Sequence, residues 1–278
     1  MHQALVDIFS YSFLLRALVA GLLVSLTSSL IGLSLVLRRF SMIGDGLSHV
    51  GFGALGIAAV LSVSPMVVTI PVVVIAAFLL LHLSEKSKGG DSYIALISSS
   101  ALALGVIAVS VAGVNTDLNA FLFGSILSVS KSDAWISIIL SIFTLATYIL
   151  FYNQIYITTF DPAFAKATGI KTERYTLLLS IFTALTIVIG MRILGSLLIS
   201  SLIIFPSLSA MKLFKTYKSV TIASAVESEI AFFIGFVLSY VLSWPTGASI
   251  VVVHLCIYLL AVIVKSISTQ MVKMHHKI

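Results

Sequence analysis

The stretch RRFSMIGDGLSHVGFGALG, residues Arg38–Gly56, holds both features that decide the fold of this chain. It starts with two arginines and continues as a glycine-rich, mostly apolar run that contains one acid, Asp45, and one histidine, His49. Long apolar runs lie on both sides of it, and basic residues gather in the cytoplasmic loops of membrane proteins. The stretch therefore predicts a turn at a membrane surface, followed by a helix that carries two ionisable groups into the bilayer.

The composition of the whole chain indicates an integral membrane protein. Of its 278 residues, 59% are hydrophobic and 9% are charged, whereas a soluble domain carries about 25% charged residues. Repeated apolar runs of about 20 residues match the hydrocarbon core of a bilayer. We therefore predict an all-α polytopic membrane protein with about eight or nine transmembrane helices and not a β-barrel. The lone Cys256 excludes an intrachain disulfide, and no cleavable signal peptide is expected.

Nine apolar segments are candidate spans of one transmembrane domain covering residues 1–278. A further segment, Asp117–Asp133, is too short to cross and is expected to form a short helix at the outer face. The nine segments are Phe13–Leu37, Ile43–Val63, Pro65–Leu83, Tyr93–Gly113, Ala134–Tyr152, Tyr175–Met191, Gly195–Leu213, Ser219–Ser243 and Ala248–Val264.

The basic residues predict the orientation of these spans. With the C-terminus inside, 13 of the 16 lysines and arginines lie in cytoplasmic loops, and Arg16, Lys131 and Arg192 lie outside. Nine spans then place the N-terminus outside. The net charge of +6 reflects this asymmetry, and nucleic-acid binding is not expected.

Asp45 and His49 are the first candidate metal ligands. A spacing of four residues puts both side chains on one helix face, one turn apart. A carboxylate and an imidazole suit Zn²⁺, with Mn²⁺ or Fe²⁺ as alternatives. Flanking glycines would let this helix pack closely, so that the polar face meets the bundle interior or a second copy of the chain. A structural role remains open at this point, since Asp45 could cap the helix or pair with Arg39.

Three further ionisable residues lie away from the ends of predicted spans, where each is costly. Glu227 and Glu229 are two residues apart, so they face different directions on a helix. Either could reach back toward Lys215 or Lys218. Glu229 and His254 are secondary metal candidates, and a satisfied interhelical hydrogen bond is the plainer interpretation of His254.

The loop at residues 159–175 predicts a short surface helix on the cytoplasmic side, at about 160–170. Asp161 or Thr159 is placed to cap it, Pro162 fits its first turn, and Gly169 ends it. Phe164 and Ala165 are expected on its apolar face. An exposed phenylalanine on a capped helix favours a docking element for another protein.

The chain contains no phosphate-binding G-x-x-x-x-G-K-[ST] motif, so it is not expected to be an enzyme by itself. Any ATP hydrolysis that drives it must belong to a separate subunit.

Five sequence blocks, in this order, resemble the permease subunits of metal-ion ABC importers, the zinc, manganese and iron class of bacterial uptake systems. The double arginine followed by S-x-I-G-D-x-L-S-H is closer to the zinc branch. The blocks are VLRRFSMIGDGLSHVGFGALG (Val36–Gly56), LFGSILSVSKSD (Leu122–Asp133), DPAFAKATGI (Asp161–Ile170), GSLLISSLIIFPSLSA (Gly195–Ala210) and PTGASIVV (Pro245–Val252).

The resemblance implies a homodimeric permease in the bacterial cytoplasmic membrane, driven by two copies of an ATP-binding ABC subunit. Asp161, Phe164, Ala165 and Gly169 would belong to the helix that couples to that ATPase. An extracellular metal-binding protein would deliver the ion, and Asp45 and His49 would line its path. No cofactor would be bound permanently, and the transported ion would be a divalent metal, with Zn²⁺ favoured.

One position departs from the pattern of this family. Many relatives carry an aspartate two residues before the proline of the P-x-G block, whereas this chain has Ser243 there, followed by Trp244. Two alternatives therefore stay open: import of a metal chelate by the same architecture, and a proton-coupled secondary transporter that uses Glu227, Glu229 and His254.

Overall fold

The computed structural model describes residues 6, 8–86, 90–113, 124 and 130–275, and within them the chain is helical with no strand. The short helix predicted at Asp117–Asp133 falls mostly outside these residues. The principal helices are α2 (Ser12–Leu37), α3 (Ile43–Val60), α4 (Pro65–Lys86), α5 (Gly90–Ala112), α7 (Lys131–Leu150), α8 (Tyr152–Phe160), α9 (Pro162–Ala167), α10 (Thr172–Leu194), α11 (Ser196–Leu213), α12 (Tyr217–Leu242) and α13 (Thr246–His275).

Eight of these helices are long and apolar enough to cross a membrane: α2, α3, α4, α5, α7, α10, α12 and α13. The ninth predicted span corresponds to α11, whose 18 residues extend for about 27 Å at 1.5 Å per residue. Its apolar part, Leu198–Leu213, is shorter than the others. The prediction of an all-α membrane protein with eight or nine spans is therefore confirmed.

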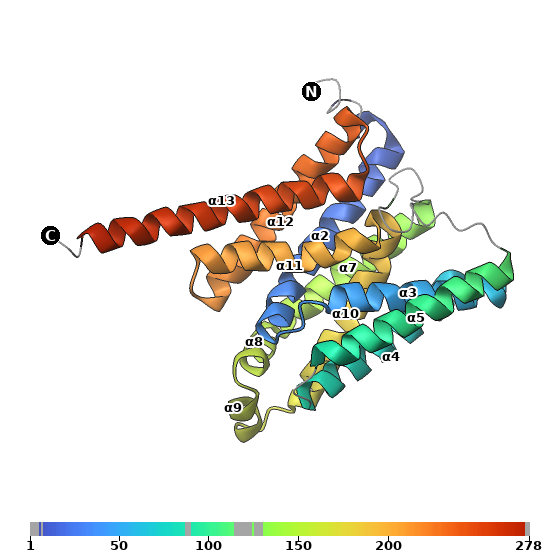
Figure 1. The fold of residues 1–278 in the computed structure, drawn as a ribbon, viewed down its shortest axis with the longest axis horizontal. Coiled ribbons are helices and arrows are strands. Elements are labelled where there is room, and N and C mark those ends of the chain that lie inside the picture. Colours follow the sequence, from blue (N-terminus) through green and yellow to red (C-terminus); the bar gives the residue numbers. More distant parts are fainter. Residues whose placement is uncertain (1–5, 7, 87–89, 114–123, 125–129, 276–278) are drawn as a thin grey trace.

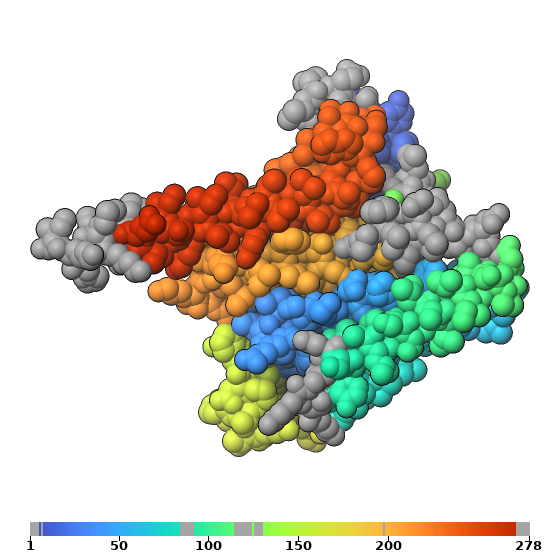
Figure 2. Space-filling model, viewed as in Figure 1, coloured from blue at the N-terminus to red at the C-terminus, as the bar shows by residue number. Residues whose placement is uncertain are grey.

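The helices form two groups on either side of a central pair (Figure 1). The first group is α3, α4 and α5, in which α3 packs most closely on α5. The second group is α11, α12 and α13, and α13 runs out beyond the rest of the chain (Figure 2). Helices α2 and α10 lie between the groups, since α2 contacts α11 and α12 whereas α10 contacts α3 and α4. This arrangement holds the two sets of ionisable residues in different parts of the bundle.

Buried hydroxyl groups hold the central helix α2 against α12. The Ser25 and Ser228 hydroxyls lie 2.7 Å apart, and the Ser228 hydroxyl also donates to the backbone carbonyl of Ser25 at 3.2 Å. Both side chains are fully buried. Other buried hydroxyls, such as that of Thr183, donate to carbonyls one turn back in their own helix, which satisfies them without water.

Glycines allow α3 and α5 to approach each other with their backbones in contact. A Cβ atom added at Gly53 would lie 2.7 Å from the carbonyl oxygen of Ala101, and one added at Gly105 would lie 2.8 Å from the Gly53 Cα. These distances are too short for any side chain, so the close packing predicted from the glycine-rich sequence of α3 is confirmed. Small residues that let backbones approach are the usual basis of helix pairing in membranes.

We expect Gly53→Leu to destabilise the protein by about 3 kcal/mol, the upper range for overpacking a tight interface. The inserted side chain would meet the backbone of α5, which cannot move aside as a flexible side chain would. Thermal unfolding in detergent would measure the effect. Ala103→Leu is the matched control, because Ala103 lies on the exposed face of the same α5 helix. Equal unfolding temperatures for the two variants would contradict this account.

Candidate metal-binding pair and coupling segment

Asp45 and His49 lie one turn apart near the start of α3. The Asp45 Oδ2 atom is 3.5 Å from the His49 Nε2 atom, and their side chains are 43% and 23% exposed. The other ring nitrogen of His49, Nδ1, is buried and has no hydrogen-bond partner in the part of the chain that is described. The pair therefore offers a carboxylate and an imidazole that are not fully used within the fold, which is what a metal site requires.

Asp45 and His49 lie in the first turns of α3, where the neighbouring helices leave both side chains partly exposed. Five glycines mark faces that other helices cover: Gly46, Gly53 and Gly56 toward α5, Gly44 toward α11, and Gly51 toward α10. A carboxylate and an imidazole at membrane depth do not face lipid without a large cost. The exposed parts of these two side chains must therefore meet water or another protein surface in the membrane.

The structural alternatives for Asp45 find little support. The N-cap residue of α3 is Met42, and no side chain caps the helix there. Among the described residues, the ion pair of Asp45 is with His49, and none joins Asp45 to Arg39. The position of Asp45 in the first turn still stabilises its negative charge through the helix dipole.

A second pair of ionisable residues joins α12 to α13. The Glu227 Oε1 atom lies 3.6 Å from the His254 Nδ1 atom, with His254 completely buried and the Glu227 side chain 10% exposed. The ring of Phe205 on α11 stacks on the imidazole with centroids 6.3 Å apart. Neither ring nitrogen of His254 has a hydrogen-bond partner in the described chain.

The carboxylate beside His254 is therefore that of Glu227, and no ion pair joins His254 to Glu229, the other secondary metal candidate, within the described residues. The two glutamates face different directions, as their spacing predicted, and no ion pair links either one to Lys215 or Lys218 within the described residues. The Oε1 atom of Glu229 is buried without a hydrogen-bond partner there. No group of three or more His, Cys, Asp or Glu side chains gathers in the described ranges closely enough to hold a metal ion.

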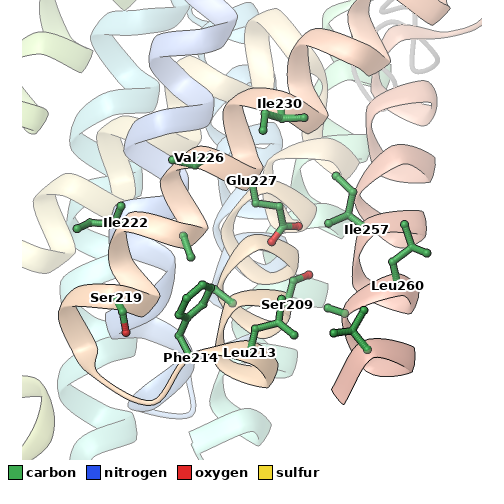
Figure 3. A pocket seen from close by; sticks show the side chains of 14 residues that line it. Ser209, Leu213, Phe214, Ser219, Ile222, Val226, Glu227, Ile230, Ile257 and Leu260 are labelled. Atoms are coloured by element: carbon green, nitrogen blue, oxygen red, sulfur yellow. The ribbon is translucent and has the colours of Figure 1, made fainter. Parts of the chain in front are cut away.

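Glu227 also lines an apolar cavity of about 710 Å³ between α11, α12 and α13, which is open to the surface of the chain. Figure 3 shows its carboxylate directed into the space that Ile257 and Leu260 of α13 border on the far side. Phe214 and Leu213 lie at one end of the cavity. The part of α13 that carries Ile257 and Leu260 is thus separated from α12 by open volume, in contrast to the tight α3–α5 contact.

The short helix predicted at about 160–170 is α9, with its capping as expected. The Asp161 carboxylate accepts a hydrogen bond from the Phe164 backbone N–H at 2.8 Å, and Pro162 occupies the first turn. Gly169 has a positive φ of 84°, and the Ile170 N–H donates to the Ala165 carbonyl at 2.9 Å. This pattern is the usual glycine-terminated end of a helix.

Phe164 and Ala165 lie on different sides of α9, contrary to the single apolar face expected from the sequence. Phe164 is 57% exposed, whereas Ala165 is completely buried. Ala165 therefore holds α9 against its own chain, where α9 contacts α8 and α10. Phe164 is the large apolar side chain of the predicted coupling set that is available to contact another protein, and Asp161 and Gly169 are exposed beside it.

Two features of the site escaped the sequence analysis. The Glu227–His254 pair joins residues 27 positions apart on different helices, and no local sequence pattern predicts such a contact. The second feature is a group of aromatic residues around Tyr217. In the sequence, Tyr217 looks like an ordinary residue at the start of a helix. Its three aromatic neighbours at residues 152–160 recur at the four-residue spacing of one helix face, and that spacing was the available signal.

Comparisons with known proteins agree with this architecture. The chain is 31% identical to the manganese import system permease protein ScaB of Streptococcus gordonii. The matched region covers 94% of this chain and 94% of that protein. It is 29% identical to the high-affinity zinc uptake system membrane protein ZnuB of Haemophilus influenzae, covering 90% of this chain and 97% of that protein. The solved structure of PsaBC from Streptococcus pneumoniae in complex with Fab superposes with a TM-score of 0.83, at 29% identity and 94% coverage of both chains.

The resemblance predicted from the five sequence blocks is thereby confirmed. Eight apolar helices and bacterial relatives of nearly full length identify a multi-pass protein of the bacterial cytoplasmic membrane. The profile of the ABC 3 transport family matches residues 10–265, and the chain belongs to that family.

Proposed function

We propose that this chain is the membrane-spanning permease subunit of an ATP-driven importer of divalent metal ions. The observation that carries the proposal is the Asp45–His49 pair, whose side-chain atoms lie 3.5 Å apart at the partly exposed start of a helix that is otherwise packed through glycines. Carboxylate and imidazole ligands suit Zn²⁺, Mn²⁺ and Fe²⁺. Partial exposure of both side chains leaves them accessible to an ion that passes along this face.

A single chain supplies only half of a typical metal site. The described residues bring no third His, Cys, Asp or Glu to the Asp45–His49 pair, whereas zinc prefers about four ligands. A homodimer that brings together the partly exposed starts of two α3 helices would provide two carboxylates and two imidazoles. It would also remove both pairs from lipid, which lowers the cost of ionisable groups in the membrane.

Two other partners follow from the family and from the surface of the chain. An ATP-binding subunit would dock on α9, where Phe164 is 57% exposed on a helix whose first turn is capped by Asp161. An extracellular metal-binding protein would deliver the ion to the opposite side. Because the chain itself has no ATP-binding motif, the energy for transport would come from the docked ATPase.

Zinc is the favoured ion and manganese is the second candidate. The imidazole of His49 favours the softer ion, since manganese is usually held by oxygen ligands. Manganese is supported by the names of relatives, because ScaB and the two MntC proteins with the next highest similarity are manganese systems, whereas ZnuB is a zinc system. Both groups are about equally similar to this chain, at 29–31% identity.

Uptake of labelled zinc by cells that express the complete system tests the proposal, with manganese as competitor. We expect ATP-dependent accumulation of zinc. Excess manganese should reduce this accumulation by less than about tenfold, because the site is expected to bind zinc more tightly than manganese. Manganese uptake that zinc fails to inhibit would assign the chain to manganese. Uptake that collapses with the proton gradient and persists without an ATPase would support the proton-coupled alternative. Uptake that requires an added organic ligand would support a chelate importer.

A further inference from the structure

A cluster of aromatic side chains surrounds Tyr217 where α12 begins. We define this tyrosine cluster as Tyr148, Tyr152, Tyr156, Phe160 and Tyr217. The ring centroid of Tyr217 lies 5.6 Å from that of Tyr152, 4.9 Å from that of Tyr156 and 5.9 Å from that of Phe160. The three neighbours all belong to α8, and their spacing of four residues places them on one face of that helix.

Hydroxyl groups tie the same tyrosine to two more helices. The Tyr217 hydroxyl lies 3.0 Å from the Ser34 hydroxyl on α2 and 3.2 Å from the Tyr148 hydroxyl on α7. Tyr217 is 7% exposed, Tyr148 is 2% exposed and Ser34 is completely buried. A buried chain of hydroxyls holds its geometry firmly, because breaking one link leaves polar groups without partners.

Helix α8 reaches α12 through these rings, and it leads directly into α9. Figure 1 shows α8 and α9 following one another at the edge of the bundle. A second tie lies at the end of α2, where Arg38 donates to the Thr158 carbonyl of α8 at 3.0 Å. A displacement of α9 therefore moves α8, which is held to α12 by Tyr217 and to α2 by Arg38.

The opposite face of α12 has room to move. Tyr217 and Val226 are nine residues apart, which is two and a half helical turns, so they lie on opposite faces of α12. Val226 and Glu227 line the cavity of about 710 Å³ between α12 and α13 (Figure 3). The part of α12 between Tyr217 and Glu227 thus packs against the tyrosine cluster on one face and borders the cavity on the other.

We propose that Tyr217 is the positioning residue that transmits the movement of the coupling segment α8–α9 to α12. The inference rests on the proposed docking of an ATPase at α9 and goes beyond it, because it assigns the connection inside the membrane subunit. When the ATPase displaces α9, the rings of α8 carry Tyr217 with them. The inner half of α12 then shifts into the cavity and changes the position of Glu227.

The test compares transported ions with hydrolysed ATP in liposomes that contain the purified permease and its ATPase. The liposomes receive zinc or manganese, whichever the cells take up, together with the extracellular metal-binding protein. We expect Tyr217→Leu to lower the number of ions moved per ATP by about tenfold, within the range for residues that carry coupling between sites. Tyr217→Phe keeps the ring contacts, and its ratio should stay within about threefold of the wild type. Both variants should still co-purify with the ATPase, because neither changes α9.

Tyr175→Leu is the matched control, since Tyr175 pairs with Phe151 at 6.1 Å and lies outside the tyrosine cluster. Phe160→Leu supplies an independent variant from the α8 side, at a residue that is 58% exposed and whose truncation spares the core. Phe160→Leu should also lower the number of ions moved per ATP. It tests the inference by itself if Tyr217→Leu fails to fold. The inference would be overturned if the folded variants moved as many ions per ATP as the control variant does. Absence of ATP-driven uptake by the wild type would instead overturn the proposed function.

Discussion

Metal uptake is expected to fall by more than about 100-fold in His49→Ala and in Asp45→Ala. Loss of an outer-shell partner of a metal ligand already costs about 10–100-fold in affinity or activity, and these two residues are proposed as ligands themselves. The His49 Nε2 atom is 3.5 Å from the Asp45 Oδ2 atom, so each variant removes one ligand and leaves the other without its neighbour. Uptake of labelled zinc, with manganese as competitor, measures the loss.

Assembly with the ATPase should survive both substitutions. Asp45 and His49 are 43% and 23% exposed, and neither belongs to the apolar core of the bundle. Co-purification of the ATPase at the wild-type ratio would separate a lost ligand from a misfolded protein. His82→Ala is the control for histidine removal, because His82 stacks on Phe78 within α4 and belongs to neither ionisable pair. Normal uptake by both variants would make the pair structural.

Much of the fold could be predicted from local features of the sequence. Apolar runs fix the positions of membrane helices because backbone polar groups must be satisfied within each segment. The ends of α9 followed from Asp161 and Gly169, whose capping roles depend on residues within one turn. The glycines of α3 predicted a close approach, and only the identity of the partner helix, α5, required the structure.

The arrangement of the ionisable residues could be predicted only in part. Asp45 and His49 are on one helix, and their spacing alone determines that they meet. Glu227 meets His254 because α12 and α13 pack side by side, and this contact depends on the rotation of each helix about its axis. The same limitation applies to Ala165, which sequence grouped with Phe164 but which the packing of α9 on α8 and α10 buries.

Phe164→Ala is expected to weaken binding of the ATPase by about 30-fold or more, the loss typical of a residue that contributes 2 kcal/mol or more to an interface. Phe164 is 57% exposed on a helix whose first turn is capped by Asp161, so it presents a large apolar side chain in a fixed direction. Large aromatic anchors of this kind dominate many protein interfaces. Titration of the purified ATPase against the permease in detergent would measure the change in Kd.

Phe214→Ala is the matched control, because Phe214 is 45% exposed and follows α11 in another loop on the expected cytoplasmic side. It should leave the Kd within about twofold of the wild type, as most interface-distant or rim positions do. Ala165→Glu gives a different signature, since it places a charge at a completely buried position and should lower thermal stability as well as ATPase binding. If Phe164→Ala binds the ATPase with wild-type affinity, α9 is not the docking element, and the exposed phenylalanine requires another partner.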